Sequence, residues 1–235
     1  VGNGPELLKL PRPGGVVFDL DGTLLDTEPL YVRSVEKILS PLGLRYEDDV
    51  RQRCMGLPSH RSAEIIVDAY CLLSSIEDFM AERENHLRGL LKHMVEIRGA
   101  GQFVTTIAGN IPLALATSTY ADLAIEKLKA THWGHFIESR TYGDDPEIAQ
   151  SKPSPDIFML AAARIDQAPE TCIAFEDSPN GIRAAKSAGM TVIGIASAPA
   201  ASRSVEPDFW IEDYGDLTDL LNDWLGAEKQ ESSTI

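Results

Sequence analysis

Two aspartates one residue apart end an apolar run near the start of the chain, in the string Asp19-Leu20-Asp21-Gly22-Thr23. Because side chains alternate along a strand, Asp19 and Asp21 lie on the same side if the strand continues through them. Neighbouring carboxylates repel and require a cation or a shared proton, and an all-oxygen donor set suits Mg²⁺. The same string is also compatible with a solvated turn, in which Asp and Gly serve the geometry of the turn.

Three further groups that could bind a phosphoryl group or a cation occur later in the chain. Thr117 and Ser118 carry hydroxyls where an apolar run ends, and a hydroxyl there could donate to a phosphoryl oxygen. Lys152 lies among prolines that stiffen the backbone, so its ammonium is delivered rigidly and can neutralise a transferring phosphoryl group. Glu176 and Asp177 offer two more carboxylates for a cation site. Each group alone also fits an ordinary turn, a solvated surface or a helix start.

The apolar runs read as strands that are buried on both faces, because they are continuous and bounded by turn residues. They predict four strands and a weaker fifth, at 14–20, 112–117, 172–175, 191–195 and 209–211. Helical spacing separates them at 121–130, 155–164 and 180–188. This alternation predicts an α/β fold, a Rossmann-like parallel sheet with helices on both faces. The acidic groups then lie at the carboxyl ends of strands, where open α/β sheets bind ligands.

The stretch between the first two strands carries no convincing strand pattern. Amphipathic helices are predicted instead at 29–40, 62–72 and 76–91. We therefore expect a core domain of residues 1–27 and 99–235 with an inserted helical domain of residues 28–98. The pattern alone also allows these helices to pack directly on the sheet.

The composition limits the classes of partner. Of the 235 residues 43% are hydrophobic, which is enough for one or two domains. Lys and Arg number 21 against 36 Asp and Glu, a formal charge of −15, which is opposite to what binding to a nucleic-acid backbone needs. We expect neither nucleic acid nor a membrane surface as a partner. A phosphorylated substrate would need a local positive site, supplied by a metal ion or a few cations.

The cysteines, the length of the apolar runs and the first residue of the chain bear on the cellular location of the protein. Cys54, Cys71 and Cys172 lack metal-ligand spacing, which predicts reduced thiols and a cytoplasmic protein. The apolar runs are far shorter than the roughly 20 residues that span a membrane. The chain starts at Val1 rather than Met, so we expect a fragment or a processed form, and removal of a targeting segment stays open.

Taken in order, the motifs resemble the signature of the haloacid-dehalogenase-like hydrolase superfamily. The matching strings are VVFDLDGT, the hydroxyls after PLALA, SKPSPDIF and EDSPNGI. The resemblance implies that Asp19 is a nucleophile that forms an aspartyl-phosphate, and that Asp21 protonates the leaving oxygen and later activates water. It implies that Thr117 binds the phosphate, with Ser118 as the neighbouring candidate, and that Lys152 neutralises the developing charge.

The same resemblance implies Mg²⁺ as the cofactor. Its ligands would be Asp19, the main-chain oxygen of Asp21, and Asp177. Glu176 would be accessory, acting through water or by orienting the other ligands. The dehalogenase branch lacks an aspartate at the second position, so Asp21 favours phosphoryl transfer over cleavage of a carbon–halogen bond.

The predicted insertion occupies the place of the helical cap in this superfamily, where the substrate is selected. Glu28, and His60 or Arg61 in the loop 55–61, are candidates for contacting the substrate, as is Ser118; a solvated loop explains the cap residues equally well. The strings GDDPEIAQSKPSPDIF and AERENHL resemble the branch of pseudouridine-5′-phosphatase and glycerol-3-phosphatase-like enzymes. The resemblance therefore implies a phosphatase of a small phosphorylated metabolite, such as a sugar, polyol or nucleoside monophosphate, and we expect a monomer, the default for a capped enzyme.

Two other functions use similar residues. A β-phosphoglucomutase-like mutase has the same core and differs mainly in cap groups that retain a sugar bisphosphate. A receiver-type signalling domain, or a non-catalytic relative that binds a partner, is an alternative from another class. A receiver has no long helical insertion and no need of Asp21, and the complete set of carboxylates disfavours a non-catalytic relative.

Overall fold

The computed structural model describes residues 7, 9–54, 57–196 and 205–226. The chain forms two compact units, one of residues 1–25 with 96–235 and the other of residues 26–95. These boundaries lie close to the residues 28 and 98 expected from the sequence. No helix in the described ranges has the length and apolar character needed to cross a membrane.

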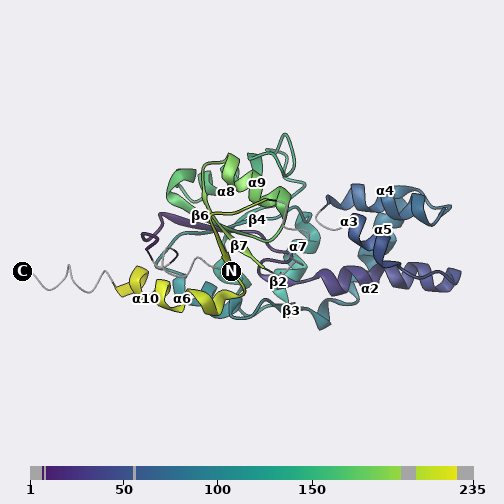
Figure 1. Cartoon of the computed structure of the whole chain (residues 1–235), viewed down its shortest axis with the longest axis horizontal. Coiled ribbons are helices and arrows are strands. Elements are labelled where there is room, and N and C mark those ends of the chain that lie inside the picture. The colour runs from purple at the N-terminus through teal and green to yellow at the C-terminus, as the bar shows by residue number, and fades with distance from the viewer. Residues whose placement is uncertain (1–6, 8, 55–56, 197–204, 227–235) are drawn as a thin grey trace, which may run out of the picture. The chain divides into compact units, whose positions relative to one another are not determined.

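A six-stranded sheet organises the first unit (Figure 1). Its strands are β1 (Gly15–Phe18), β4 (Leu113–Ala116), β5 (Ser139–Thr141), β6 (Cys172–Glu176), β7 (Thr191–Ile195) and β8 (Phe209–Ile211). The order across the sheet is β5-β4-β1-β6-β7-β8, and every neighbouring pair is parallel. The predicted parallel α/β fold is confirmed. The sequence missed β5, a three-residue edge strand whose residues Ser-Arg-Thr make no apolar run.

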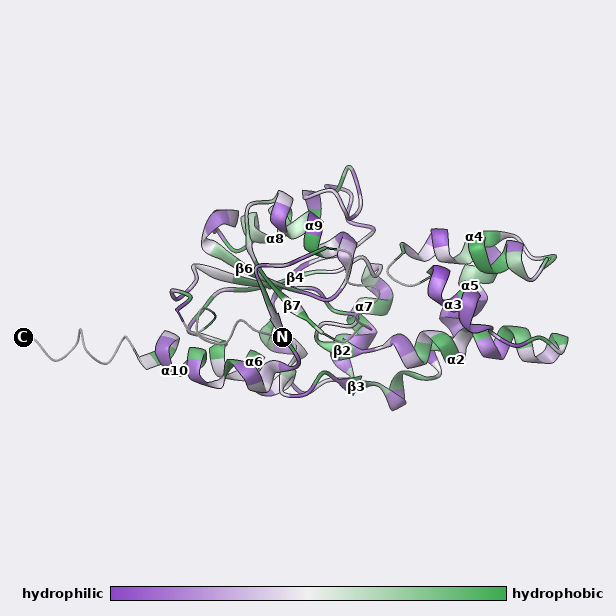
Figure 2. Ribbon diagram, in the orientation of Figure 1, coloured by the Kyte–Doolittle hydropathy of each residue, from purple (hydrophilic) through white to green (hydrophobic). Residues whose placement is uncertain are grey.

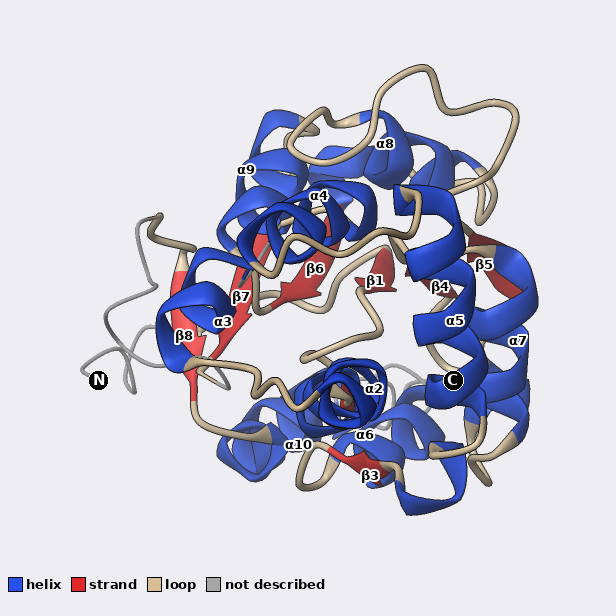
Figure 3. Ribbon diagram, turned by 90° about the vertical axis from the view of Figure 1, so that its right-hand side faces the viewer, coloured by secondary structure: helices blue, strands red, loops and turns tan. Residues whose placement is uncertain are grey.

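Helices cover both faces of this sheet (Figure 3). On one face, Val17 and Ala174 pack in a core with α8 (Asp156–Ala163) and α9 (Pro179–Ser187). On the other face, the rings of Phe18 and Phe175 stack at 5.3 Å, and Phe103 packs edge-on against both. This second face carries α6 (Ala100–Ile107) and α10 (Thr218–Gly226), two short helices that the sequence pattern did not predict. A further helix, α7 (Ala121–Lys129), follows β4.

The second unit is helical and has a core of its own. Its helices are α2 (Glu28–Leu39), α3 (Asp48–Cys54), α4 (Ser59–Ala69) and α5 (Ile76–Arg88). The hydropathy colouring in Figure 2 shows apolar and polar residues mixed along each of them, as expected of amphipathic helices. Their buried side chains include Val35, Leu39, Ile66 and Phe79. The sequence predicted α2, α4 and α5 with shifted ends and missed the seven-residue α3. Met55 and Gly56 of the predicted loop 55–61 lie outside the described residues.

A two-stranded sheet of β2 (Leu25–Asp26) and β3 (Val95–Glu96) corrects the expectation that the stretch between the first two strands is free of strand. Each strand has two residues, too few for any periodicity to be read. Short 3₁₀ turns complete the described elements: η1 (Ser40–Leu42), η2 (Leu91–His93), η3 (Gly134–Phe136), η4 (Pro169–Thr171) and η6 (Tyr214–Leu217).

Candidate active site

The strand order places the predicted acidic groups at one edge of the sheet. β1 lies between β4 and β6, with Phe18 level with Leu115 on one side and Phe175 on the other. The residues just beyond these strands are therefore neighbours in space, although they are far apart in sequence. Asp19 follows β1, Thr117 follows β4, and the Glu176-Asp177 pair stands at the end of β6. The carboxyl edge beside a reversal of strand order is where such sheets bind ligands.

The turn after β1 is shaped to receive Asp177. Gly22 has φ of 82°, and its N–H donates to the carbonyl of Leu25 at 2.7 Å. A Cβ at this position would lie 2.1 Å from Asp177 Oδ2, which is closer than two non-bonded atoms approach. The Thr23 hydroxyl donates to the other carboxylate oxygen of Asp177 at 3.3 Å. The turn therefore needs glycine both for its backbone conformation and for the space that Asp177 occupies.

Lys152 joins two of the carboxylates. Its Nζ lies 2.6 Å from Asp19 Oδ1 and 2.7 Å from Glu176 Oε1, and all three side chains are buried. The backbone that delivers Lys152 is held by Asp156, whose Oδ2 accepts from the N–H groups of Ala149 and Gln150. The Lys152–Pro153 peptide bond is cis.

Burial and the attraction between opposite charges have opposing effects on the pKa values of Asp19 and Lys152. Burial raises the pKa of Asp19 to about 7, and the attraction of the Lys152 ammonium opposes that rise. Burial acts to lower the pKa of Lys152, but the charges of Asp19 and Glu176 outweigh it and hold that pKa above its ordinary value. The ionised form of Lys152 is therefore favoured, and any further positive charge beside Asp19 would favour the carboxylate form of Asp19.

The donor atoms suit a magnesium ion. Asp19, Glu176 and Asp177 each offer a carboxylate oxygen, and these oxygens lie within 4.8 Å of one another. Glu176 Oε1 accepts from Lys152, and its Oε2 accepts from the N–H and hydroxyl of Ser178 at 2.7 and 3.0 Å. Asp19 and Asp177 are accordingly the better direct ligands, and the set of oxygen donors fits Mg²⁺. The resemblance implied an accessory role for Glu176, whose two carboxylate oxygens already accept hydrogen bonds from Lys152 and Ser178.

Tyr214 adds a polar group beside these carboxylates. The side chain is buried, and its hydroxyl has no hydrogen-bond partner among the described residues. Burial, together with the charges of Asp19 and Asp177, raises the pKa of Tyr214 well above its ordinary value. A buried hydroxyl without a protein partner is a group that a hydrated cation would satisfy.

The two hydroxyl candidates after β4 differ in their surroundings. Thr117 is buried, and its Oγ1 accepts a hydrogen bond of 3.1 Å from the N–H of Thr119. Ser118 is exposed, and its carbonyl packs so closely on Gly143 that a Cβ there would lie 2.1 Å from the oxygen. Of these two residues, Thr117 is therefore the one whose hydroxyl lies at the buried end of β4.

Sequence reasoning missed the partners of Asp21. Lys127 Nζ lies 2.5 Å from Asp21 Oδ1, and the Thr119 hydroxyl donates to Oδ2 at 2.6 Å. Lys127 projects from α7 and is fully buried. The sequence did contain a signal, because Lys127 continues the apolar spacing of Leu123 and Ala124 on the predicted helix at 121–130. A charged residue on an apolar helix face calls for a buried counter-charge.

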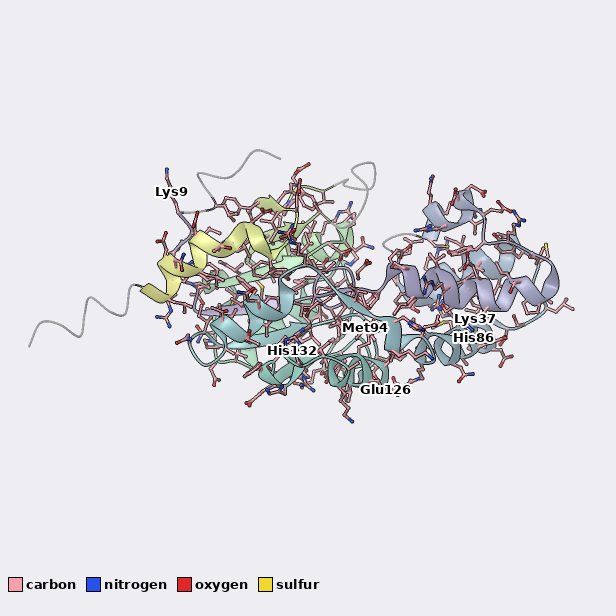
Figure 4. The ribbon with its side chains drawn as sticks, turned by 90° about the horizontal axis from the view of Figure 1, so that it is seen from below. Lys9, Lys37, His86, Met94, Glu126 and His132 are labelled. Carbon is pink, nitrogen blue, oxygen red and sulfur yellow. The ribbon has the colours of Figure 1, made fainter. Side chains whose placement is uncertain are left out.

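The remaining candidates, Glu28, His60 and Arg61, belong to the second unit. Glu28 pairs with Arg51 at 3.5 Å. His60 and Arg61, in the first turn of α4, both pair with Glu64, the former at 3.3 Å. Other basic residues of this unit lie on its helices, among them Lys37 on α2 and His86 on α5, which Figure 4 labels.

The fold and the order of the motifs agree with a comparison against known families. Residues 16–195 match the model of the haloacid dehalogenase-like hydrolases. The chain belongs to this family. The resemblance that the four motifs suggested is thus confirmed over most of the chain.

Relatives with named activities are similar in length. The chain is 38% identical over 183 residues to "Probable pseudouridine-5'-phosphatase" of Drosophila melanogaster, covering 75% of this chain and 79% of that protein. It is 36% identical over 179 residues to the phosphorylated carbohydrates phosphatase of Thermotoga maritima, covering 74% and 81%. Among solved structures, CbbY of Rhodobacter sphaeroides in complex with phosphate superimposes with a TM-score of 0.74 at 25% identity, covering 88% of this chain and 96% of that one. The named relatives act on small phosphorylated metabolites.

Proposed function

We propose that this protein is a Mg²⁺-dependent phosphatase that hydrolyses a small phosphorylated metabolite through an aspartyl-phosphate on Asp19. The observation that carries the proposal is the buried contact of Lys152 with Asp19, at 2.6 Å, beside Glu176 and Asp177. An ammonium fixed on one oxygen of a carboxylate orients that group and can balance the charge of an incoming phosphoryl group. The phosphatase relatives support this reading.

In the proposed reaction Asp19 attacks phosphorus, and the bond from phosphorus to the leaving oxygen breaks. Asp21 gives its proton to that oxygen and then takes a proton from the water that hydrolyses the aspartyl-phosphate. Thr117 would donate to a phosphoryl oxygen, and Lys152 would stabilise the charge spread over these oxygens. Bound Mg²⁺, held by Asp19, Asp177 and the main-chain oxygen of Asp21, would supply charge stabilisation for the phosphoryl group.

The activities of the relatives support a proposal for the substrate class. We propose a sugar, polyol or nucleoside monophosphate, with residues 26–95 serving as the cap that selects it. Glu28, His60 and Arg61 would contact the substrate's polar end, with Ser118 contributing from the core. Arg61, a cation, and the His60 imidazole lie in the exposed first turn of α4, where both can donate hydrogen bonds to an anionic or hydroxylated ligand.

Hydrolysis of 4-nitrophenyl phosphate tests the reaction type. We expect turnover with Mg²⁺, loss of turnover in EDTA and recovery when Mg²⁺ is restored in excess. A panel of sugar phosphates, glycerol phosphates and nucleoside monophosphates, read by release of inorganic phosphate, then identifies the substrate class. An isomerised sugar phosphate without phosphate release would identify a mutase instead. Absence of hydrolysis across the whole panel with Mg²⁺ would overturn the proposal.

A further inference from the structure

Lys127 is a buried cation within an otherwise apolar helix face. Its side chain is fully buried, and the neighbouring buried residues of α7 are Leu123, Ala124 and Leu128. Removing an ammonium from water is costly unless an opposite charge lies beside it. An aliphatic side chain at this position would pack without that cost. The charge at Lys127 therefore needs the Asp21 carboxylate, whose Oδ1 lies 2.5 Å away.

Asp21 is held through both of its carboxylate oxygens. Lys127 binds Oδ1, and the Thr119 hydroxyl donates to Oδ2 at 2.6 Å. Lys127 Nζ also lies 3.4 Å from Thr119 Oγ1, so the two groups that hold Asp21 contact each other. The Thr119 N–H is in turn bonded to Thr117 Oγ1. This network fixes the rotation of the Asp21 carboxylate, two residues after Asp19 in the turn that follows β1.

The two buried lysines of the site have separate carboxylates. Lys152 contacts Asp19 and Glu176, and Lys127 contacts Asp21. Lys127 reaches Asp21 from α7, far from it in sequence, and its side chain is fully buried, whereas that of Asp21 is 23% exposed. Its chemistry therefore acts on Asp21 and not on a substrate directly.

We propose that Lys127 is a positioning residue for Asp21, and that it holds the Asp21 carboxylate where that group accepts a proton from the attacking water. The inference rests on the proposed function. In this step the water oxygen bonds to phosphorus, and the bond between phosphorus and Asp19 breaks with its electron pair returning to Asp19. One water proton passes to Asp21, and inorganic phosphate leaves.

The leaving group of 4-nitrophenyl phosphate allows formation of the aspartyl-phosphate to be distinguished from its hydrolysis. 4-Nitrophenolate departs with little help from an acid, so formation of the aspartyl-phosphate depends little on Asp21, whereas its hydrolysis depends on Asp21 strongly. In Lys127→Met we expect kcat to fall about 10- to 100-fold, the size of effect that misplacement of a reacting group produces. We expect kcat/KM to stay near the wild-type value, and rapid mixing to show a full burst of nitrophenolate before slow turnover.

Three variants isolate the role of Lys127. Lys129→Met, on the exposed side of the same helix, should match the wild type. Lys127→Arg retains the positive charge and should recover part of the lost kcat. In an Asp21→Asn background, Lys127→Met should cause no further loss, because the group through which it acts is already gone.

The outcomes distinguish this inference from the proposed function. A wild-type kcat in Lys127→Met would overturn the positioning role. So would a fall in kcat on adding Lys127→Met to Asp21→Asn that is as large as the fall that Lys127→Met causes alone. An equal fall of kcat, kcat/KM and burst amplitude would also overturn it, because that pattern means a smaller folded fraction. If the wild type with Mg²⁺ hydrolyses no phosphate monoester, the proposed function itself fails.

Discussion

Lys152 and Glu176 form a buried ion pair, with Nζ 2.7 Å from Oε1 and side chains that are 6% and 1% exposed. Glu176 is itself fixed by the N–H and hydroxyl of Ser178, at the residue that caps α9. A Cβ at Gly181 would lie 1.5 Å from Glu176 Oε1, so the first turn of α9 must carry glycine there. The position of the lysine is therefore determined by the junction of β6 with α9 as well as by its own loop.

Glu176→Gln tests this junction. The change keeps the shape of the side chain but removes its charge, so Lys152 keeps only Asp19 as a charged partner. We expect catalytic efficiency to fall about 10- to 100-fold, as is common for groups that orient metal-site residues. We expect the free energy of unfolding in urea to fall by roughly 1–3 kcal/mol, the cost of weakening a buried charged hydrogen bond. Glu170→Gln, at an exposed position on η4, is the matched control, and equal behaviour of the two variants would contradict the prediction.

Asp19→Asn removes the proposed nucleophile without changing its volume. Because burial already disfavours the charge of Asp19, and Lys152 keeps Glu176 as a partner, the variant should fold. We expect it to show no burst and no steady-state release of nitrophenolate from 4-nitrophenyl phosphate. Circular dichroism should be that of the wild type. Retained turnover would refute the assignment of Asp19 as nucleophile.

Gly22→Ala separates backbone strain from loss of the metal site. Alanine at φ of 82° is strained, and its Cβ would displace the Asp177 carboxylate. Gly109 is the matched control in the same unit, since its φ is 76° and no atom lies within 4 Å of an added Cβ. Both variants should lose about 1–2 kcal/mol of stability from the left-handed backbone.

Only Gly22→Ala should also require more Mg²⁺ for half-maximal activity and show a lower kcat. Urea unfolding measures the shared loss of stability, and Mg²⁺ titration of phosphatase activity measures the difference. Identical Mg²⁺ dependence in the two variants would show that Asp177 does not depend on the space beside Gly22.

The sequence predicted those parts of the site that sit in local motifs. Asp19 and Asp177 directly follow apolar strands, so the strand pattern alone places them at one edge of the sheet. Lys152 was recognisable because the string KPSPDIF that it begins resembles a motif of the family, and because the two prolines after it restrict the backbone. In each case the pattern that indicates the position is adjacent in sequence to the candidate residue.

The pairing of Lys127 with Asp21 could not be read in the same way. The two residues are 106 positions apart, and their contact depends on how α7 packs after β4. The spacing on α7 shows that Lys127 faces inward, but not which carboxylate it meets. The missed strand β5 has a different cause: it is an edge strand of three residues, Ser139 and Arg140 are only partly buried, and its residues make no apolar run.

Asp145 and Arg164 provide a test of stability away from the catalytic groups. Their hydrogen bond, with Arg164 Nη1 2.5 Å from Asp145 Oδ2, lowers the pKa of Asp145 below its ordinary value of 3.8. The unfolded chain therefore takes up the proton first on acidification, so the pair's contribution is present above about pH 4 and is lost as the pH falls through the lower, folded pKa. Asp145→Asn should cost roughly 0.5–1 kcal/mol at pH 7, since solvent screens this partly exposed pair, and the difference should shrink towards pH 3. Urea unfolding at both pH values measures it, with the exposed Asp223→Asn as control, and a cost that grows on acidification would contradict the sign.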